Sequence, residues 1–216
     1  MVSIRSMNIE QAYDIWADRY DTDQNLTRDL DQQVTVETLS PLTFKFVIEL
    51  GCGTGKNTLF LLTKAQRVIA LDFSEKMLSQ ARGKITDERA TFRRTDITKP
   101  WEIPDHFADL ITSSLVMEHI EDLSFIFNQA RLKLKTGGYF FISELHPSRQ
   151  YLGSKAGFFD TEDGRVNPTA YIHHISSFWD SARQNDFHLT ILKEWFDTGI
   201  EDKPPRLVSF LFQVQK

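Results

Sequence analysis

The sequence predicts an α/β protein built on a mostly parallel sheet of seven strands with helices on both faces. Short apolar runs alternate with amphipathic runs of helix length through the middle of the chain, which is the pattern of repeated strand–helix units. Three glycines, Gly51, Gly53 and Gly55, follow the first of these apolar runs, and Asp72 ends the second. In open parallel sheets, a glycine turn and an acidic residue at these places border a ligand site.

The N-terminal part, residues 1–43, is predicted to form a helical lid. Apolar and aromatic residues recur at helical spacing over 9–21, and a second helix is expected over 26–39. Pro41 then ends the helical pattern before the first strand of the sheet.

The central part, residues 44–146, is predicted to form the ligand-binding core. Strands are expected at the short apolar runs, over 44–50, 67–72, 90–96, 108–115 and 139–145. Helices are expected between them, from a cap at Thr54 or Asn57 to 65, from a cap at Ser74 to 85, and over 123–135. Gly137 and Gly138 are expected to turn the last helix into the fifth strand.

The C-terminal part changes character. Residues 147–186 are rich in turn residues and form an insertion on the acceptor side, with a hairpin tip at Asp163-Gly164. Two closing strands are expected over 187–196 and 206–215. The chain of 216 residues, 1–216, is thus expected to form a single domain.

Composition argues against nucleic-acid and membrane partners. The 25 basic and 30 acidic residues give a net charge of −5, a poor match to a phosphate backbone. The single cysteine, Cys52, cannot form an internal disulfide, which favours a reducing compartment. The N-terminus lacks the apolar core of a signal peptide, and no apolar run reaches membrane-spanning length. We therefore expect a soluble cytoplasmic protein.

The glycine loop does not fit either common phosphate-binding pattern. The dinucleotide fingerprint G-x-G-x-x-G requires a third glycine where this chain has Lys56. The phosphate loop G-x-x-x-x-G-K-[ST] requires a glycine at Leu50 and a hydroxyl residue at Asn57. Asp72, 21 residues after Gly51, can still accept hydrogen bonds from ribose hydroxyls. The expected ligand therefore carries a ribose and needs no pyrophosphate cradle.

Five segments together resemble the class I S-adenosylmethionine-dependent methyltransferases, whose fold is Rossmann-like. The matching segments are VIELGCGTG (47–55), VIALDFSEKML (68–78), RRTDI (93–97), ADLITSSLVMEHIED (108–122) and, in the lid, YDIWADRYD (13–21). The resemblance implies S-adenosyl-L-methionine as cofactor and S-adenosyl-L-homocysteine as product. It also implies direct, in-line transfer of the methyl group to an acceptor.

The resemblance assigns cofactor roles to fourteen positions. Residues around the methionine end would include Glu49 and the loop glycines, Asp72 would hold the ribose, and Asp96 would meet the adenine. The full set implied is Tyr20, Glu49, Gly51, Cys52, Gly53, Thr54, Gly55, Asp72, Phe73, Met77, Asp96, Ile97, Ser113 and Ser114.

The catalytic base is less well marked by the sequence. His146 follows the fifth strand and His173-His174 lies in the insertion, so we take these three as candidates to orient or deprotonate the acceptor. A structural role for any of them stays open. No histidine or cysteine spacing matches a zinc motif, and no metal site is expected.

The acceptor is expected to be a small molecule methylated on oxygen or nitrogen. Nucleic-acid amino methyltransferases of this fold carry an Asn/Asp-Pro-Pro-aromatic run where this chain has Ser113-Ser114-Leu115-Val116. Three alternatives stay open at this stage: a noncatalytic cofactor-binding or partner-binding subunit, an aminopropyl transferase of the same fold, and an NAD-dependent oxidoreductase, which Lys56 disfavours. The sequence allows a monomer or a homodimer.

Overall fold

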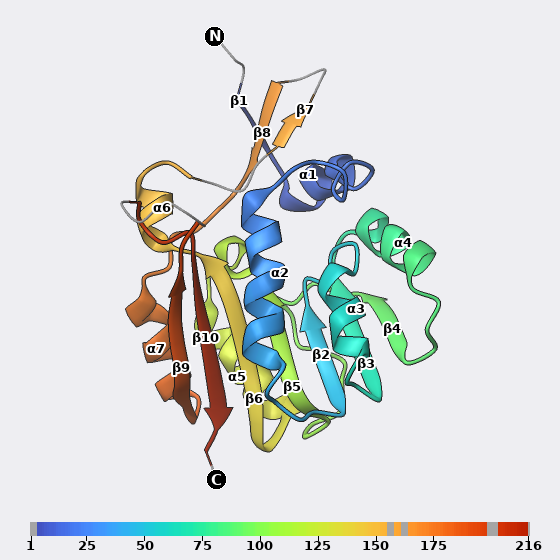
Figure 1. Cartoon of the computed structure of the whole chain (residues 1–216), viewed down its shortest axis with the longest axis vertical. Helices are drawn as coiled ribbons and strands as arrows, with labels where there is room; N and C mark the ends of the chain where they lie inside the picture. Colours follow the sequence, from blue (N-terminus) through green and yellow to red (C-terminus); the bar gives the residue numbers. More distant parts are fainter. Residues whose placement is uncertain (1–3, 155–157, 161–163, 198–202, 216) are drawn as a thin grey trace.

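The computed structural model describes residues 4–154, 158–160, 164–197 and 203–215, and it contains the expected seven-stranded sheet (Figure 1). The strands lie in the order β4, β3, β2, β5, β6, β10, β9. Their bounds are Ala90–Arg94, Arg67–Asp72, Phe46–Leu50, Ala108–Ser114, Leu134–Leu145, Leu207–Val214 and Phe187–Trp195. The first five run parallel, and β10 pairs antiparallel with both β6 and β9.

Helices cover both faces of this sheet, as the strand–helix alternation predicts. One apolar cluster joins α2 (Leu26–Leu39) and α3 (Lys56–Leu62) to one face, and α4 (Glu75–Lys84) contributes Leu78 to it. A second cluster joins α5 (Leu123–Lys133) and α7 (Ile175–Gln184) to the other face. Figure 1 shows α2 and α3 in front of the strands. Two hydrophobic cores, one on each face, therefore pack the sheet between two layers of helices.

A second, smaller sheet joins the beginning of the chain to the insertion. Strand β1 (Ile4–Met7) pairs in parallel with β8 (Gly164–Pro168), which pairs antiparallel with β7 (Phe158–Asp160). The predicted hairpin is thus confirmed, although Asp163 at its tip lies outside the described residues. Helix α1 (Ile9–Trp16) follows β1 directly, so the N-terminal segment and the insertion meet above the large sheet (Figure 1).

Two predicted helix boundaries are wrong for identifiable reasons. Helix α1 ends at Trp16 instead of Asp21, because Asp18 and Asp21 lie where a helix C-terminus disfavours negative charge. Helix α3 is capped by neither Thr54 nor Asn57: its N-cap is Gly55 in the left-handed conformation, and those two side chains bind Asp21 and Asp31.

Two more corrections concern the second half of the chain. Strand β6 begins at Leu134 and runs through both glycines, where its pairing with β5 is irregular. The insertion contains two helices that its turn residues concealed, α6 (Pro147–Tyr151) and α7. Phe178 on α7 stacks on Phe210, with 4.7 Å between the ring centroids, and belongs to the core.

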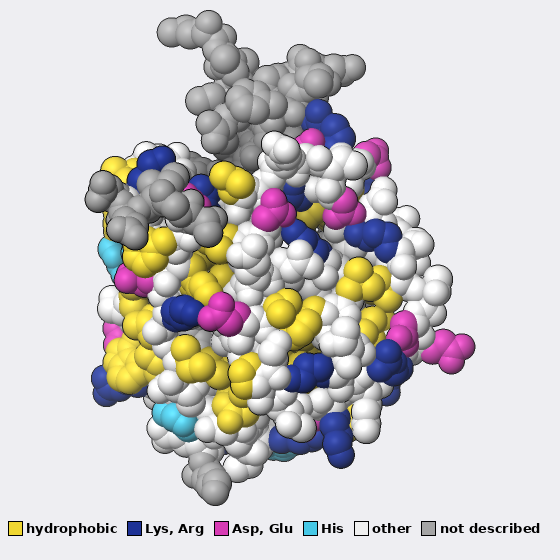
Figure 2. All heavy atoms as spheres, viewed as in Figure 1, with side chains coloured by type: hydrophobic (Ala, Val, Ile, Leu, Met, Phe, Trp, Pro, Cys, Tyr) yellow, Lys and Arg dark blue, Asp and Glu magenta, His cyan; other side chains and the backbone are white. Residues whose placement is uncertain are grey.

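The surface facing the viewer in Figure 2 carries interspersed basic and acidic side chains. Within the described part of the chain, no helix is both long and apolar enough to span a bilayer. The described His, Cys, Asp and Glu residues form no group of three or more that could hold a metal ion.

Candidate active site

A cavity of about 350 Å³ lies where the parallel strands end. Its floor comes from the loops after β2, β3, β4 and β5, and its far wall comes from α1. The described lining residues are Asn8, Ile9, Glu10, Tyr13, Tyr20, Gly51, Gly53, Asp72, Phe73, Met77, Thr95, Asp96, Ile97, Thr98, Ser114, Leu115, Val116, His119 and Ile120. This is the edge of an open α/β sheet at which ligands bind.

Two glycines in the loop after β2 have backbones that larger residues would distort. Gly51 has φ +65°, and a Cβ there would lie 2.3 Å from Cγ2 of Val116. Gly53 has φ +53° and its backbone faces the cavity. Gly55 also has positive φ, but its missing side chain makes room for Ile85, at 2.7 Å from an added Cβ. Gly55 therefore shapes the start of α3 and lies outside the cavity lining.

Asp72 connects the ends of β3 and β2. Its Oδ2 accepts a hydrogen bond from the Gly53 amide at 2.8 Å, and its Oδ1 accepts one from the Ser74 amide at 2.9 Å. Burial raises the pKa of Asp72 to about 6, although these backbone donors oppose the rise. The carboxylate is thereby fixed in position with lone pairs left to accept from ribose hydroxyls.

Beyond Asp72 the cavity is lined by apolar side chains in its interior and by polar side chains at its rim. Phe73, Met77 and Ile97 all line it, and Met77 is fully buried. Asp96 stands at the rim, where its Oδ1 accepts from the backbone amide and the hydroxyl of Thr98. Its second oxygen can accept from an exocyclic amine, and a flat heterocycle fits between the apolar side chains.

A smaller cavity of about 50 Å³ continues from the first past the glycine loop. The two share Tyr20, Gly51, Gly53, Ser114 and Leu115. The small cavity is also lined by charged and polar residues, namely Arg28, Asp31, Glu49, Cys52, Thr54, Lys56, Asn57 and Thr112. It can therefore receive the charged tail of a ligand whose flat end lies in the larger cavity.

Two buried carboxyl groups, those of Glu49 and Asp31, line the small cavity. Burial raises the pKa of Glu49 to about 8, while a 2.5 Å hydrogen bond from the Thr58 hydroxyl opposes the rise. Burial also raises the pKa of Asp31 to about 6, against the effect of nearby hydroxyls including that of Ser143. Even so, Asp31 Oδ1 has no hydrogen-bond partner of good geometry among the described residues. An ammonium group bound there would satisfy this oxygen.

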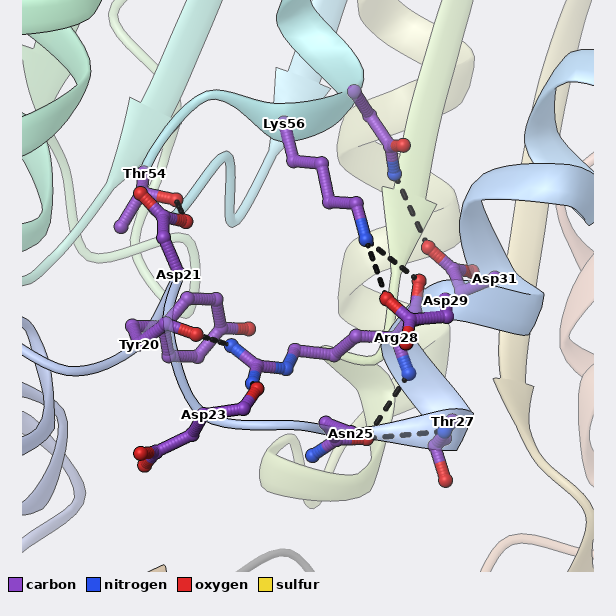
Figure 3. A network of polar contacts seen from close by, with 11 residues as sticks. Tyr20, Asp21, Asp23, Asn25, Thr27, Arg28, Asp29, Asp31, Thr54 and Lys56 are labelled. Carbon is purple, nitrogen blue, oxygen red and sulfur yellow. Dashed lines mark hydrogen bonds and ion pairs between the residues drawn. The ribbon is translucent and has the colours of Figure 1, made fainter.

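Arg28, the third residue of α2, holds the loop that closes the small cavity (Figure 3). Its guanidinium donates to the carbonyl oxygens of Tyr20 and Asp23. It also lies over the Tyr20 ring, 4.1 Å from the centroid, and 5.0 Å from that of Trp16. In the same view the Thr54 hydroxyl donates to Asp21 at 2.6 Å. The loop between α1 and α2, residues 17–25, is thus fastened to the glycine loop and to α2.

A hydrogen-bonded chain crosses the top of the large cavity. The Tyr13 hydroxyl on α1 lies 2.8 Å from Nε2 of His119, which follows β5. The other ring nitrogen of His119, Nδ1, lies 2.9 Å from the carbonyl oxygen of Thr169 in the insertion. Three segments far apart in sequence therefore meet at one imidazole.

Most of the cofactor residues expected from the sequence do meet at these cavities. Twelve of the fourteen line one or both, and the exceptions are Gly55 and Ser113. None of the three candidate catalytic histidines is among the described lining residues. His146 contacts Ser148 at 2.6 Å and Glu194 at 3.0 Å, and His173 contacts the Ile120 carbonyl. His174 contacts Tyr151 at the surface, and a catalytic role for the three stays a prediction.

Sequence reasoning missed the polar side chains that come from helices outside the motif segments. Arg28, Asp31 and Asn57 lie on α2 and α3, where nothing in the spacing marks them as site residues. The signal for His119 was present, because it follows the fourth parallel strand in the expected ligand-facing loop. Tyr13 was expected only as part of an aromatic stripe, but it lines the cavity.

Comparison with known proteins agrees with this geometry. A family model described as a methyltransferase domain matches residues 48–142. An uncharacterized methyltransferase of Emericella nidulans, AN0656, is 30% identical over 220 residues, which cover 84% of this chain and 76% of that protein. Phosphoethanolamine N-methyltransferase 1 of Triticum aestivum is 31% identical over 155 residues, which cover 67% of this chain but 29% of that protein.

Among solved structures, the fold is similar to N-methyltransferase NodS of Bradyrhizobium japonicum bound to S-adenosyl-L-homocysteine. The TM-score is 0.72 at 16% identity, and the match covers 97% of this chain and 100% of NodS. At this identity the likeness shows the fold alone. The seven-stranded sheet and its helices are therefore arranged as in NodS.

Proposed function

The chain belongs to the class I S-adenosylmethionine-dependent methyltransferases, and we propose that it methylates a small molecule on oxygen or nitrogen. The observation that carries this proposal is the set of contacts among Tyr13, His119 and Thr169, which we call the roof of the cavity. Tyr13 of α1 and Thr169 of the insertion both bind His119, so the chain itself covers the strand ends on this side. An acceptor that enters under such a roof has to be small.

The residues described above fit the cofactor. Asp72 would hold the ribose, Phe73 and Met77 would enclose the adenine, and Asp96 would accept from the adenine amino group. In the small cavity, Asp31 and Glu49 would receive the ammonium group of the methionine end. The bound cofactor supplies an electrophilic methyl group on a sulfonium, and the buried carboxylates suit its positive charge.

Arg28 and Lys56 favour the intact cofactor over its decarboxylated form. Both line the small cavity, where either can attract the carboxylate of a methionine tail. An aminopropyl transferase binds a cofactor that lacks this carboxylate, so its ligand would offer Arg28 no anion, and Lys56 would keep only its ion pair with Asp29 at 3.0 Å. This observation supports methyl transfer as the reaction.

The protein's contribution to rate is mainly alignment. Holding an acceptor in line with an activated methyl group can supply about 7–11 kcal/mol of the barrier. The single cysteine, Cys52, is free and buried, which supports a reducing, cytoplasmic setting for this chemistry.

The test is an acceptor screen with the full chain and methyl-labelled S-adenosylmethionine. The panel contains aliphatic amines, phenols and small carboxylic acids, with duplex DNA, tRNA and a mixture of unfolded proteins as the macromolecular set. We expect label transfer to a member of the small-molecule set. Transfer to nucleic acid or protein alone would contradict the proposal.

A further inference from the structure

We propose that Tyr13 and His119 form a proton relay that removes a proton from the acceptor, an inference that rests on the proposed function. The Tyr13 hydroxyl and the His119 ring both line the cavity and lie 2.8 Å apart. The relay deepens the function by naming the acceptor class: a group that carries an N–H or O–H proton when it binds.

The contacts of His119 fix which of its nitrogens carries hydrogen. A carbonyl oxygen can only accept, so the 2.9 Å contact with Thr169 requires a hydrogen on Nδ1. In the neutral ring Nε2 is then an acceptor, and the hydrogen of the 2.8 Å contact comes from the Tyr13 hydroxyl. The lone pairs of Tyr13 Oη stay available to an acceptor in the cavity.

The surroundings of Tyr13 suit a relay and oppose a stable phenolate. Burial raises the pKa of Tyr13 well above its usual value, and the nearby Tyr20, Glu118, Asp72 and Glu144 raise it further. The phenol therefore gives up its proton only as it receives another.

The step balances in atoms and charge. The X–H bond of the acceptor breaks and its proton goes to Tyr13 Oη, while the Tyr13 hydroxyl proton moves to Nε2 of His119. The electron pair left on X forms the new bond to the methyl carbon, and the pair of the broken carbon–sulfur bond stays on sulfur. The positive charge that leaves the sulfonium reappears on the imidazolium, which the Thr169 carbonyl continues to hold.

The first experiment needs no acceptor. Histidine ¹⁵N spectra of the full chain with S-adenosylhomocysteine should show His119 neutral, with its hydrogen on Nδ1. Tyr13→Phe should shift the Nε2 signal of His119, while Tyr139→Phe, a matched change on β6, should leave it in place. Hydrogen on Nε2 of His119, or an unchanged signal in Tyr13→Phe, would overturn the relay.

The second experiment uses an acceptor identified in the screen. Tyr13→Phe and His119→Gln should each lower kcat by about 10²–10⁴-fold, with a much smaller change in affinity for S-adenosylhomocysteine. The loss should shrink as the pH passes the acceptor's own pKa, because an ionised acceptor needs no base. His188→Asn on β9 is the control and should retain wild-type kcat.

The remaining outcomes separate the relay from the function on which it rests. Wild-type kcat in Tyr13→Phe at every pH, together with a loss in an alanine variant of His146, His173 or His174, would overturn the relay and leave the methyltransferase intact. A screen with no small-molecule acceptor would contradict the proposed function instead. The histidine spectra would then decide whether the pair exists with product bound.

Discussion

The Oδ2 atom of Asp72 accepts a hydrogen bond from the Gly53 amide at 2.8 Å, so one carboxylate joins the end of β3 to the glycine loop after β2. The two strongest signals in the sequence, the glycines and the acidic residue, are therefore one structural unit. Asp72 orients the loop and offers its remaining lone pairs to the ribose. A change at Asp72 should consequently affect cofactor binding in two ways.

Asp72→Asn should weaken binding of S-adenosylhomocysteine by about 10–100-fold, because a charged acceptor contributes about 1.5–3 kcal/mol per hydrogen bond. Isothermal calorimetry measures this directly. Asp180→Asn, an exposed change on α7, is the control and should bind like the wild type. Equal affinity of Asp72→Asn and the wild type would show that the Asp72 carboxylate does not contribute to cofactor binding.

Gly51→Ala should destabilise the chain by at least about 2 kcal/mol. The new Cβ would lie 2.3 Å from Val116 Cγ2, at a φ of +65° that alanine disfavours. Gly83→Ala is the matched control, since nothing lies within 4 Å of a Cβ there. Because Gly83 lies inside α4, alanine should stabilise the helix by about 0.5–1 kcal/mol. Urea unfolding would compare the two, and similar stabilities would refute the steric argument.

The ligand-free chain should lose stability as the pH rises. The pKa of Glu49 is about 8 in the fold against a usual 4.5, so the folded state binds more protons than the unfolded state between these values. The free energy of unfolding therefore falls as pH rises through this window and levels off above it. Glu144, also at about 8 because of burial, acts in the same direction.

Glu49→Gln should flatten this pH dependence, because an amide cannot titrate. Urea unfolding at a series of pH values from about 5 to about 8 measures the slope. Glu88→Gln, an exposed change between α4 and β4, should retain the wild-type slope. A Glu49→Gln chain whose stability falls as steeply as that of the wild type would show that Glu49 is not the titrating group.

Arg28→Met should loosen the loop between α1 and α2, residues 17–25, and weaken cofactor binding. The variant keeps apolar contact with Trp16 and Tyr20 but loses the bonds to the Tyr20 and Asp23 carbonyls. We expect lower affinity for S-adenosylhomocysteine and faster chymotryptic cleavage near Tyr20. Arg183→Met on α7 serves as the matched control. Wild-type cleavage and affinity in Arg28→Met would mean that other contacts hold the loop over residues 17–25.

The sequence predicted the sheet well because local patterns specify it. Strands β3 and β10 and helix α2 follow from runs of apolar residues or regular spacing, and Ser74 caps α4 as expected. In the small sheet the hairpin of β7 and β8 was predicted but the addition of β1 was not, because the pairing of β1 with β8 joins segments about 160 residues apart. Pairing over such distances leaves no local signature.

The residues of the candidate site also fall into two groups, those that the sequence predicted and those that it did not. Asp72, Gly51 and Gly53 lie at strand ends, where a spacing in the sequence fixes a position in space. Asp31 and Arg28 reach the small cavity only through the packing of α2 against the sheet, and Thr169 reaches His119 only through the fold of the insertion. Tertiary packing decides such residues, and no spacing predicts them.

The most direct test of the account is calorimetric titration of the full chain with S-adenosylhomocysteine, with NAD as the comparison. We predict binding with a dissociation constant in the micromolar range, and no heat of binding with NAD. The cavity would then hold a ribose ligand without a pyrophosphate, as the loop from Gly51 to Gly55 indicates. Binding of NAD alone, or of neither ligand, would contradict the assignment of this cavity to S-adenosylmethionine.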